Sequence, residues 1–325
     1  MIKKPLASVI FITYNQEDLV AESIKSILEQ TYSPLEIVIS DDFSKDKTTQ
    51  KILEVTSKYE GPHLIKYCFN TQNLGLCENI NQAIKNCSGE FIFAAAGDDI
   101  SLPNRCEIVM QEWLRLDKKP GLIATDAFDM SLQGEILGVK KTSLLQSYSG
   151  IKDWINRPPY FFGSSHSWSR SFLDKFPPLN SKLFAEDHLM IFRAIISDGA
   201  HAISVPLVKH RRGGMTRKKY TSLTEKINKL KLGFPDKYEL LKQMLDDAKN
   251  LADLPLLQKH FSREIGECEL ALNLFNTKEA HQKIMQCCKV DGVSVLFKIR
   301  FLTYTTFPFI LKPLFWLKKF KKKYE

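Results

Sequence analysis

The sequence has no run of about 18–20 apolar residues, which is the length that a helix needs to cross a membrane. A membrane-spanning helix is therefore not expected. The N-terminal segment, MIKKPLASVIFITYN, has a short apolar stretch that ends in a polar turn, and it lacks the small residues of a signal-peptide cleavage site. We expect this segment to form a first strand rather than a leader.

The seven cysteines include no C-x-x-C pair, and their number is odd. This pattern is typical of free thiols in a reducing compartment, so a cytoplasmic location is expected. The chain has 325 residues, of which 44% are apolar. It can therefore bury a sizeable core without a disulfide or a structural metal, as one large domain with an appendage or as two domains.

Two motifs that bind nucleotide phosphates are missing. No G-x-G-x-x-G follows the first expected strand, and no G-x-x-x-x-G-K-[ST] occurs anywhere. A dinucleotide held at a helix N-terminus and a P-loop triphosphate site are therefore not supported. The segment around Ser164 and Ser165 has no G-x-S-x-G elbow either. Any phosphate must then be handled by other groups, of which a metal ion is the simplest.

Positive charge is concentrated at the C-terminus. The net charge is +9, and residues 289–325 hold nine Lys or Arg and two acids, or +7, which leaves about +2 for the other 288 residues. This tail also carries Phe315 and Trp316, a composition that predicts a segment lying on an anionic membrane surface. The alternative is a C-terminal helix packed on the body with a solvated lysine tip. Nucleic-acid binding is not expected, because the aromatic residues are clustered rather than set among polar ones.

Strand-length apolar runs alternate with helical patterns over the first 130 residues. Strands are expected at 7–13, 35–40, 63–70 and 90–96, and helices at 16–31, 44–59, 75–87 and from 101 onward. Ser44 and Ser101 are candidate N-caps for two of these helices. The alternation predicts an α/β fold with a mostly parallel, Rossmann-like sheet.

The rest of the chain is less regular until residue 220. A strand is expected at 121–127, a helix from Glu186 to 197, and a strand, a turn and a basic loop over 200–216. Residues 220–288 have apolar spacings of three and four, which predict a helical region.

Polar residues follow the expected strands where each one ends. Asp98 and Asp99 end the fourth strand, and Asp41 and Asp42 end the second. The carboxyl ends of parallel strands meet at one edge of a sheet, which is where such folds bind ligands. Two adjacent buried carboxylates repel unless a cation balances them, so Asp98 and Asp99 indicate a site for a divalent ion with a diphosphate. The alternative for this pair is an ordinary solvated turn.

Three segments resemble the nucleotide-sugar half of family 2 glycosyltransferases, which have the GT-A fold and invert the anomeric centre. The segments are SVIFITYNQEDLVAESIKSILEQTYSPLEIVISDDFSKDKT, NLGLCENINQAI and GEFIFAAAGDDISLPNR, and they span roughly residues 7–130. Farther on, FAEDHLMIFRAIISDG resembles the acceptor-side motif of that family, and PLVKHRRGGMT resembles its closing basic loop.

The resemblance implies a role for particular residues. Asp99 and His210 would bind Mn²⁺ or Mg²⁺, and Asp187 would be the general base with Glu186 beside it. The residues implied in donor binding are Thr13, Tyr14, Asn15, Asp41, Asp42, Asn73, Gly75, Asp98, Arg211 and Arg212.

Three positions depart from the family pattern. Phe43 replaces a glycine that follows the first acid pair, which we expect to alter the turn rather than the chemistry. Gly97 replaces the first of three acids that end in Asp98 and Asp99. His210 comes earlier than the family's usual histidine, so Arg211 and Arg212 would hold the diphosphate instead.

The expected reaction is transfer of a sugar from a nucleotide-sugar, with UDP as the expected nucleotide, to a hydroxyl of a glycan or lipid-linked acceptor in bacterial surface polysaccharide synthesis. We expect burial beside Glu186 to raise the pKa of Asp187 modestly. His166 is a candidate for contacting the acceptor, or else a structural histidine, and Trp168 either stacks on an acceptor sugar or packs in the core.

Two other functions were weighed: a non-catalytic nucleotide-sugar-binding protein at the membrane surface, and a sugar nucleotidyltransferase. The second would have a glycine-rich basic loop where this chain reads TYNQEDL. The expected division is a GT-A domain over 1–219, with a nucleotide-sugar half over 1–130 and an acceptor half over 131–219. A helical extension over 220–290 and the basic aromatic tail over 291–325 follow, and the chain is expected at the inner face of the cell membrane.

Overall fold

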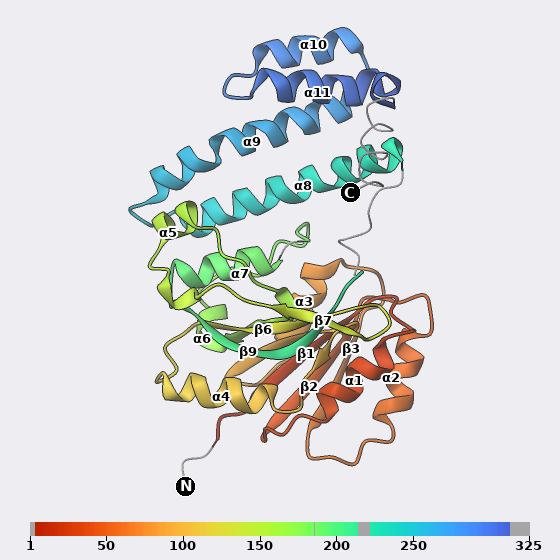
Figure 1. Cartoon of the computed structure of the whole chain (residues 1–325), viewed down its shortest axis with the longest axis vertical. Coiled ribbons are helices and arrows are strands. Elements are labelled where there is room, and N and C mark those ends of the chain that lie inside the picture. Colours follow the sequence, from red (N-terminus) through yellow and green to blue (C-terminus); the bar gives the residue numbers. More distant parts are fainter. Residues whose placement is uncertain (1–3, 185, 214–221, 313–325) are drawn as a thin grey trace. The chain divides into compact units, whose positions relative to one another are not determined.

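The computed structural model describes residues 4–184, 186–213 and 222–312. The chain divides into two compact units, residues 1–217 and 218–325, which we call unit 1 and unit 2 (Figure 1). Unit 1 carries the sheet, and the described part of unit 2 is helical.

The described residues of unit 1 form one sheet of nine strands. The strands are β1 (Ala7–Thr13), β2 (Leu35–Asp41), β3 (Leu64–Phe69), β4 (Phe91–Ala96), β5 (Ile100–Ser101), β6 (Leu122–Met130), β7 (Ile136–Lys140), β8 (Ser167–Ser169) and β9 (Ala200–Arg211). Their order is β3-β2-β1-β4-β8-β6-β9-β5, and β7 pairs with β6. The pairs β1–β2, β1–β4, β2–β3 and β6–β9 are parallel, whereas β5, β7 and β8 pair antiparallel. The predicted α/β fold with a mostly parallel sheet is confirmed.

Helices cover both faces of this sheet. They are α1 (Val20–Leu28), α2 (Thr48–Thr56), α3 (Leu76–Lys85), α4 (Arg105–Arg115), α5 (Ile151–Asn156), α6 (Arg170–Leu173) and α7 (Glu186–Ile195), with 3-10 turns η1 (Leu145–Ser147) and η2 (Gly163–Ser165). Figure 1 shows α1, α2 and α4 on one side of the sheet and α3 and α7 on the other.

Alternate strand residues build the main core of unit 1. Phe11, Ile37 and Phe93 face Ile24 and Val109 of the helices, and all five side chains are buried. Full burial of one such side chain contributes about 1.5–3 kcal/mol. The strands are rich in β-branched and aromatic residues, and each helix has an apolar stripe. Both features therefore favour helices packed on the faces of the sheet, and this packing fixes where the strands end.

Two local predictions are wrong because tertiary partners decide the local structure. Ser44 does not cap α2, whose N-cap residue makes no side-chain bond; its backbone N–H and hydroxyl donate to Asp41 instead. Ser101 does not cap α4 but lies in β5, where its hydroxyl accepts a 3.0 Å hydrogen bond from Arg105. The strand expected from residue 200 is β9, in which Pro206 sits at an irregularity of the β6–β9 pairing where its missing N–H is tolerated, and a turn at residues 212–213 follows the strand.

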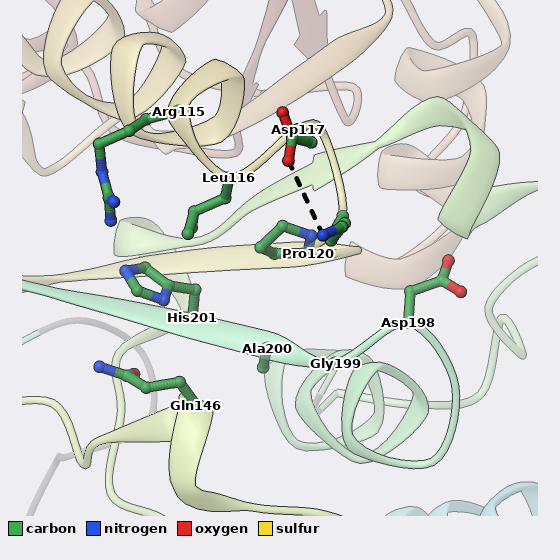
Figure 2. A pocket seen from close by; sticks show the side chains of 10 residues that line it. Arg115, Leu116, Asp117, Pro120, Gln146, Asp198, Gly199, Ala200 and His201 are labelled. Carbon is green, nitrogen blue, oxygen red and sulfur yellow. Dashed lines mark ion pairs between the residues drawn. The ribbon is translucent and has the colours of Figure 1, made fainter.

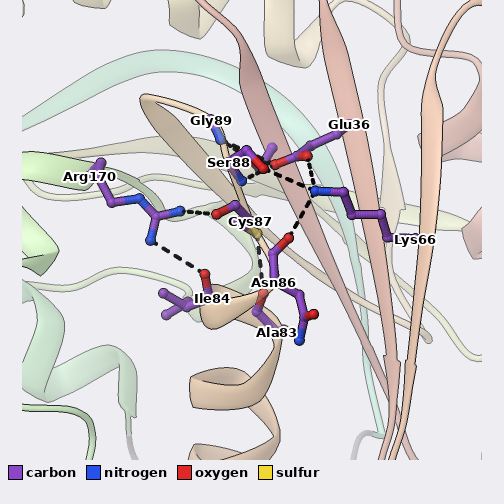
Figure 3. Close-up of polar contacts among 10 residues, drawn as sticks. Glu36, Lys66, Ala83, Ile84, Asn86, Cys87, Ser88, Gly89 and Arg170 are labelled. Atoms are coloured by element: carbon purple, nitrogen blue, oxygen red, sulfur yellow. Dashed lines mark hydrogen bonds and ion pairs between the residues drawn. The ribbon is translucent and has the colours of Figure 1, made fainter.

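A polar network ties together the opposite, amino-terminal edge of the sheet (Figure 3). The Glu36 carboxylate is 1% exposed, and it accepts hydrogen bonds from the Ser8 hydroxyl at 2.5 Å and from the Ser88 backbone N–H. Lys66 Nζ lies 2.7 Å from the other carboxylate oxygen. Arg170 donates to the last carbonyls of the α3 segment, including that of Cys87 at 2.8 Å. This network anchors the segment between α3 and β4.

Unit 2 contains α8 (Leu223–Asp247), α9 (Leu254–Asn276), α10 (Ala280–Lys289), α11 (Val295–Thr306) and the turn η4 (Pro308–Leu311). Ser222 and Glu225 form a capping box at the start of α8. Leu270 and Leu274 of α9 pack with Phe297 and Phe301 of α11 in a separate core. Among the described residues, no helix is both long enough and apolar enough to span a membrane. Phe315 and Trp316, on which the membrane-surface prediction partly depends, lie outside the described residues.

Candidate functional site

The ends of β1, β2, β3 and β4 meet at one edge of the sheet, as expected for parallel strands. The register places Thr13 opposite Asp41, Asp41 opposite Phe69, and Ile12 opposite Ala96. The acids that follow β2 and β4 are therefore close together in space. We call this edge the acidic rim, defined by Asp41, Asp42, Asp98 and Asp99.

Asp41 is 1% exposed and is held by three donors. Its Oδ1 accepts hydrogen bonds from the Thr13 hydroxyl at 2.8 Å and the Ser44 hydroxyl at 2.6 Å, and its Oδ2 accepts one from the Ser44 backbone N–H at 2.8 Å. A carboxylate has about four acceptor positions. Asp41 thus fixes the turn after β2 and keeps limited capacity for a ligand.

Asp42 holds the segment that leads into α3. Its Oδ1 accepts from the Leu74 N–H at 2.8 Å and from the Asn70 side chain at 3.0 Å, and its Oδ2 accepts from the Gly75 N–H at 2.9 Å. Asn73 donates to the Asp42 carbonyl at 3.2 Å. Gly75 has a φ of 84°, a left-handed value that favours glycine. Asn73 and Gly75 therefore shape this turn, and their predicted contact with a donor stays a prediction.

Two residues next to Tyr14 and Asp42 adopt left-handed backbone conformations. Asn15 has a φ of 49° and Phe43 has a φ of 62°. Asparagine tolerates this region, whereas a bulky residue there costs roughly 1–2 kcal/mol. Phe43 thus keeps a backbone conformation that suits the glycine that it replaces in the family pattern. Its ring is exposed, and Lys45 Nζ lies 3.1 Å from the ring centroid. Such strain is typical of ligand-binding turns.

Asp98 and Asp99 lie at the end of β4 with little solvent around them. Burial, together with the neighbouring charge of Asp99, raises the pKa of Asp98 to about 6. Burial also raises the pKa of Asp99, although the Arg211 backbone N–H donates to its Oδ1 at 2.8 Å and Arg105 and Lys140 oppose the rise. The protein itself therefore compensates the charge of this pair only in part.

Gly97 explains why the first acid of the family pattern is missing here. A Cβ at this position would lie 2.4 Å from Gln16 Oε1 and 2.8 Å from Thr13 Cγ2. A side chain at this position would therefore require the side chains of Gln16 and Thr13 to move.

The two arginines that were predicted to hold a diphosphate are both engaged with protein groups. Arg211 is 4% exposed, and its guanidinium donates to Glu22 at 2.7 Å and to the carbonyls of Asp98 and Leu132 at 3.0 Å. Arg212 is more exposed and donates to both carboxylate oxygens of Asp129. A role in holding phosphate stays a prediction for both, and for Arg211 it would require several of these bonds to break.

His210 is occupied on one ring nitrogen by Lys140, whose Nζ lies 3.0 Å from Nδ1. Lys140 Nζ also lies 2.7 Å from Asp129, and its side chain is 10% exposed. If Nδ1 accepts from this ammonium group, the neutral ring carries its proton on Nε2, which is the wrong state for a metal ligand on that atom. The role of His210 in metal binding stays a prediction.

Glu186 and Asp187 begin α7, where acids are favoured by the helix dipole. Asp187 is 27% exposed at its side chain, and its Oδ1 accepts from the His188 backbone N–H at 2.8 Å and lies 3.0 Å from His188 Nδ1. Burial alone would raise the pKa of Asp187, but the bonds and charge of His188, with His166, lower it. The expectation of a raised pKa was therefore wrong, because the adjacent histidine was not taken into account.

Arg105 and Lys140 are site residues that the sequence reasoning missed. Arg105 is 1% exposed, and its guanidinium donates to the carbonyls of Ala94 at 2.9 Å and His166 at 3.2 Å. Burial lowers its pKa to about 10, and the charge of Asp99 opposes this. Its position six residues after Asp99, at the start of α4, was a usable sign, since a buried acid pair needs a cation nearby.

A cavity of about 320 Å³ lies away from the acidic rim, at the amino-terminal ends of β6 and β9 (Figure 2). Its lining includes Arg115, Lys119, His201 and Asp198. Each of these side chains is paired with a protein group, as in the 2.9 Å contact of His201 with Glu112. The cavity contains none of the predicted site residues.

The part of the chain that carries the acidic rim is similar to a known family. Residues 8–131 match the model of Glycosyl transferase family 2. This region of the chain is similar to that family. The match covers β1 from Ser8 onward, the whole of β2, β3 and β4, and both acid pairs of the rim.

Curated relatives match the same region. "Putative glycosyltransferase EpsE" of Bacillus subtilis is 37% identical over 103 residues, which cover 32% of this chain and 36% of the relative. "UDP-Glc:alpha-D-GlcNAc-diphosphoundecaprenol beta-1,3-glucosyltransferase WfgD" of Escherichia coli is 36% identical over 34% of this chain and 42% of the relative. "Putative colanic acid biosynthesis glycosyl transferase WcaA" of Escherichia coli is 33% identical over 42% of this chain and 47% of the relative. The chain thus matches less than half the length of each of these relatives.

Solved structures resemble the fold over a longer range. TarS of S. aureus, residues 1–349 in complex with UDP-GlcNAc, matches with a TM-score of 0.55 and 19% identity, over 86% of this chain and 79% of that one. The mannosyltransferase PcManGT of Pyrobaculum calidifontis, in complex with GDP-Man and Mn²⁺, matches with a TM-score of 0.54 and 15% identity, over 96% of this chain and 88% of that one. At this identity the likeness establishes the fold, which is that of GT-A glycosyltransferases.

Proposed function

We propose that this chain is an inverting glycosyltransferase that moves a sugar from a UDP-sugar to a hydroxyl of a glycan or lipid-linked acceptor in bacterial surface polysaccharide synthesis. The observation that carries the proposal is the acidic rim at the carboxyl ends of four parallel strands, within the region that matches the family. The names of WfgD and WcaA support the acceptor class, and the TarS complex supports the donor class.

The acid pair Asp98 and Asp99 fits a divalent cation such as Mn²⁺ or Mg²⁺. Their raised pKa values mean that the surrounding protein leaves part of their charge uncompensated, and hard cations prefer carboxylate oxygens. Among the described residues, no group of three or more His, Cys, Asp or Glu side chains could hold a metal by itself. Phosphate oxygens of the donor would therefore complete the coordination, which ties metal binding to donor binding.

The metal ion, when bound, would stabilise negative charge on the departing diphosphate. The turns that Asp41 and Asp42 fix would form the wall around the nucleoside, with Thr13, Tyr14 and Asn15 on the first of them. Arg105 and Lys140 oppose the rise in the pKa of Asp99 that burial causes, because positive charge favours the carboxylate form.

Asp187 would act as the general base for the acceptor hydroxyl. His188 engages its Oδ1, which leaves Oδ2 as the oxygen to take the proton. The lowered pKa of Asp187 keeps it ionised at neutral pH, as a base must be before it accepts a proton. Attack from the face opposite the diphosphate inverts the anomeric configuration.

We assign the donor half of the GT-A domain to residues 1–130 and the acceptor half to 131–219, with 220–290 as a helical extension. The tail over 291–325 would place the enzyme on the inner face of the cell membrane. The exposed side of α11 supports this, because Val295, Leu296 and Ile299 are 70%, 76% and 59% exposed. Lys298, Arg300 and Lys312 lie in the same segment, so an anionic lipid surface complements both its charge and its apolar side chains.

The test is a transfer assay with a panel of nucleotide-sugars, Mn²⁺ or Mg²⁺, and a lipid-diphosphate-linked sugar acceptor. We expect one donor to yield a glycosylated product of inverted configuration by NMR, and Asp187→Asn to abolish transfer while UDP binding persists. Asp174→Asn, a change of the same type on the exposed surface of unit 1, is the control. Absence of transfer with every donor, although UDP binds, would favour the non-catalytic binding protein.

A further inference from the structure

His166 is a buried histidine that the proposed reaction has not yet used. It directly follows η2 and precedes β8, and its side chain is 0% exposed. Its backbone is fixed on three sides: its N–H donates to the Gly163 carbonyl at 3.0 Å, and its carbonyl accepts from the Ala94 N–H at 3.0 Å and from Arg105 at 3.2 Å. The imidazole is therefore held in one place by the sheet.

Both ring nitrogens of His166 lack a hydrogen-bond partner among the described residues. Burial lowers the pKa of this imidazole to about 4, so at neutral pH the ring is uncharged, with one N–H donor and one acceptor. A buried polar group without a partner is unfavourable, and such groups are normally satisfied by ordered water or retained for function. The ring packs against Phe161, with centroids 5.5 Å apart.

The same turn that fixes His166 also contacts the acid pair of α7. A Cβ on Gly163 would lie 3.3 Å from Asp187 Oδ2 and 3.4 Å from Glu186 Oε1, so the glycine leaves room directly beside both carboxylates. Phe161 also contacts His188, with ring centroids 5.0 Å apart. His188 therefore engages one carboxylate oxygen of Asp187, and the turn that carries His166 borders the other.

We propose that His166 is a positioning residue for Asp187, whose neutral imidazole hydrogen-bonds through one buried water to Oδ2 and so orients the carboxylate toward the acceptor hydroxyl. This inference rests on the proposed role of Asp187 as the base. A water bridge accounts for the missing direct bond and for one of the two unpartnered ring nitrogens, because one water can accept a hydrogen bond from the imidazole N–H and donate one to Oδ2. It also follows the common arrangement in which a third group orients a catalytic base.

The groups that face Asp187 are few and come from two segments. Glu186 and His188 lie on α7 itself, and His166 faces it from the segment before β8; the charge of Arg105 acts in turn on His166. Loss of the imidazole N–H donor of His166 would remove stabilisation of the ionised Asp187 carboxylate. The acid limb of kcat against pH should then move to higher pH.

The experiment compares His166→Leu with His166→Gln in the full chain, using the transfer assay. Leucine removes both ring nitrogens at similar volume, whereas glutamine keeps a donor and an acceptor. We expect leucine to lower kcat at least tenfold with the donor KM within twofold of the wild type, and glutamine to restore a measurable part of kcat. We also expect the Tm of the leucine variant to stay the same or rise, because an unpartnered buried polar group has been replaced by an apolar one.

Several outcomes would overturn the proposal. One is an unchanged kcat in the leucine variant, and another is no recovery of kcat with glutamine when both variants are folded. A third is a fall in the Tm of the leucine variant with an unshifted pH profile, which would indicate a purely structural histidine. A crystal structure that shows His166 without water or bonded away from Asp187 would also contradict it. If the wild-type chain transfers sugar to no acceptor, the proposed function fails first; if it transfers and the leucine variant transfers equally well, only the role of His166 fails.

Discussion

The backbone N–H of Arg211 donates a 2.8 Å hydrogen bond to Oδ1 of Asp99, across 112 residues of sequence. The side chain of the same arginine donates to the Asp98 carbonyl and to Glu22 of α1. One residue at the end of β9 thus fixes the acid pair at the end of β4. The two halves of unit 1 therefore meet at the acidic rim, and its geometry depends on both.

Arg211→Ala should destabilise the chain by about 1–3 kcal/mol, because it leaves the partly buried carbonyls of Asp98 and Leu132 without their donor and breaks the ion pair with Glu22, whose side chain is 60% exposed. Arg212→Ala should change stability by about 1 kcal/mol or less, since the Arg212 side chain is 54% exposed. Urea unfolding of both variants tests this. Equal losses of stability would show that Arg211 does not hold the rim together.

Asp98→Asn should raise the Tm at pH 7 and abolish metal-dependent UDP binding. The folded pKa of Asp98 is raised to about 6, so its charge opposes folding at pH values above that and has no effect well below the unfolded value near 3.8. The free energy of unfolding of Asp98→Asn should therefore exceed that of the wild type by about 1–3 kcal/mol at pH 7, and this difference should vanish by about pH 3.5. Calorimetry at both pH values, with isothermal titration of UDP and Mn²⁺, measures the two effects. A lower Tm at pH 7 would mean that the carboxylate is compensated by the protein.

The fold was largely predictable because its information is local. The apolar run of 7–13 and the stripe that contains Ile24 fix strand, helix and layering without reference to the rest of the chain. Capping was less predictable, because Ser44 and Ser101 each have a tertiary partner that competes with the local role. In general, a capping residue can be recognised from the sequence, but whether a distant carboxylate or arginine takes its side chain cannot.

The site was predictable in position but not in the pairing of its charges. The strand-end rule placed Asp41 and Asp99 at one edge. Nothing in the spacing indicates that Lys140 lies against Asp129 and His210, because β6, β7 and β9 come together only in the folded sheet. The effect of His188 on the pKa of Asp187 is different, because the two residues are adjacent and their contact does not depend on long-range pairing.

Phe43→Gly should stabilise the chain, whereas Phe43→Ala should not. At a φ of 62° a side chain is strained by roughly 1–2 kcal/mol, and only glycine relieves this. Alanine removes the ring and its contact with Lys45 but keeps the strain, so it is the matched control. We expect the glycine variant to be about 1 kcal/mol more stable than the alanine variant in urea unfolding. If the alanine variant is as stable as the glycine variant, the backbone at this turn is not strained.

Glu36→Gln should destabilise unit 1 by about 2–4 kcal/mol at pH 7, because Lys66 and the Ser88 N–H lose their charged partner in a buried site. Burial alone would raise the pKa of Glu36, but the bonds from Lys66, Ser8 and Ser88 lower it below its ordinary value of 4.5. A lowered pKa contributes stability that is present above the unfolded value and is lost as the pH falls through the folded value.

The difference in the free energy of unfolding between the wild type and Glu36→Gln should therefore be largest at pH 7. It should shrink below about pH 4.5 as the wild-type carboxylate takes up a proton. Chemical unfolding at pH 7, 5 and 3.5 measures this. Glu90→Gln is the control, since Glu90 pairs with Lys118 at the surface with 55% of its side chain exposed and should change stability by about 1 kcal/mol or less at any pH. A pH-independent difference at position 36 would mean that the glutamate acts by shape and hydrogen bonding alone, and that its charge does not hold the amino-terminal edge of the sheet.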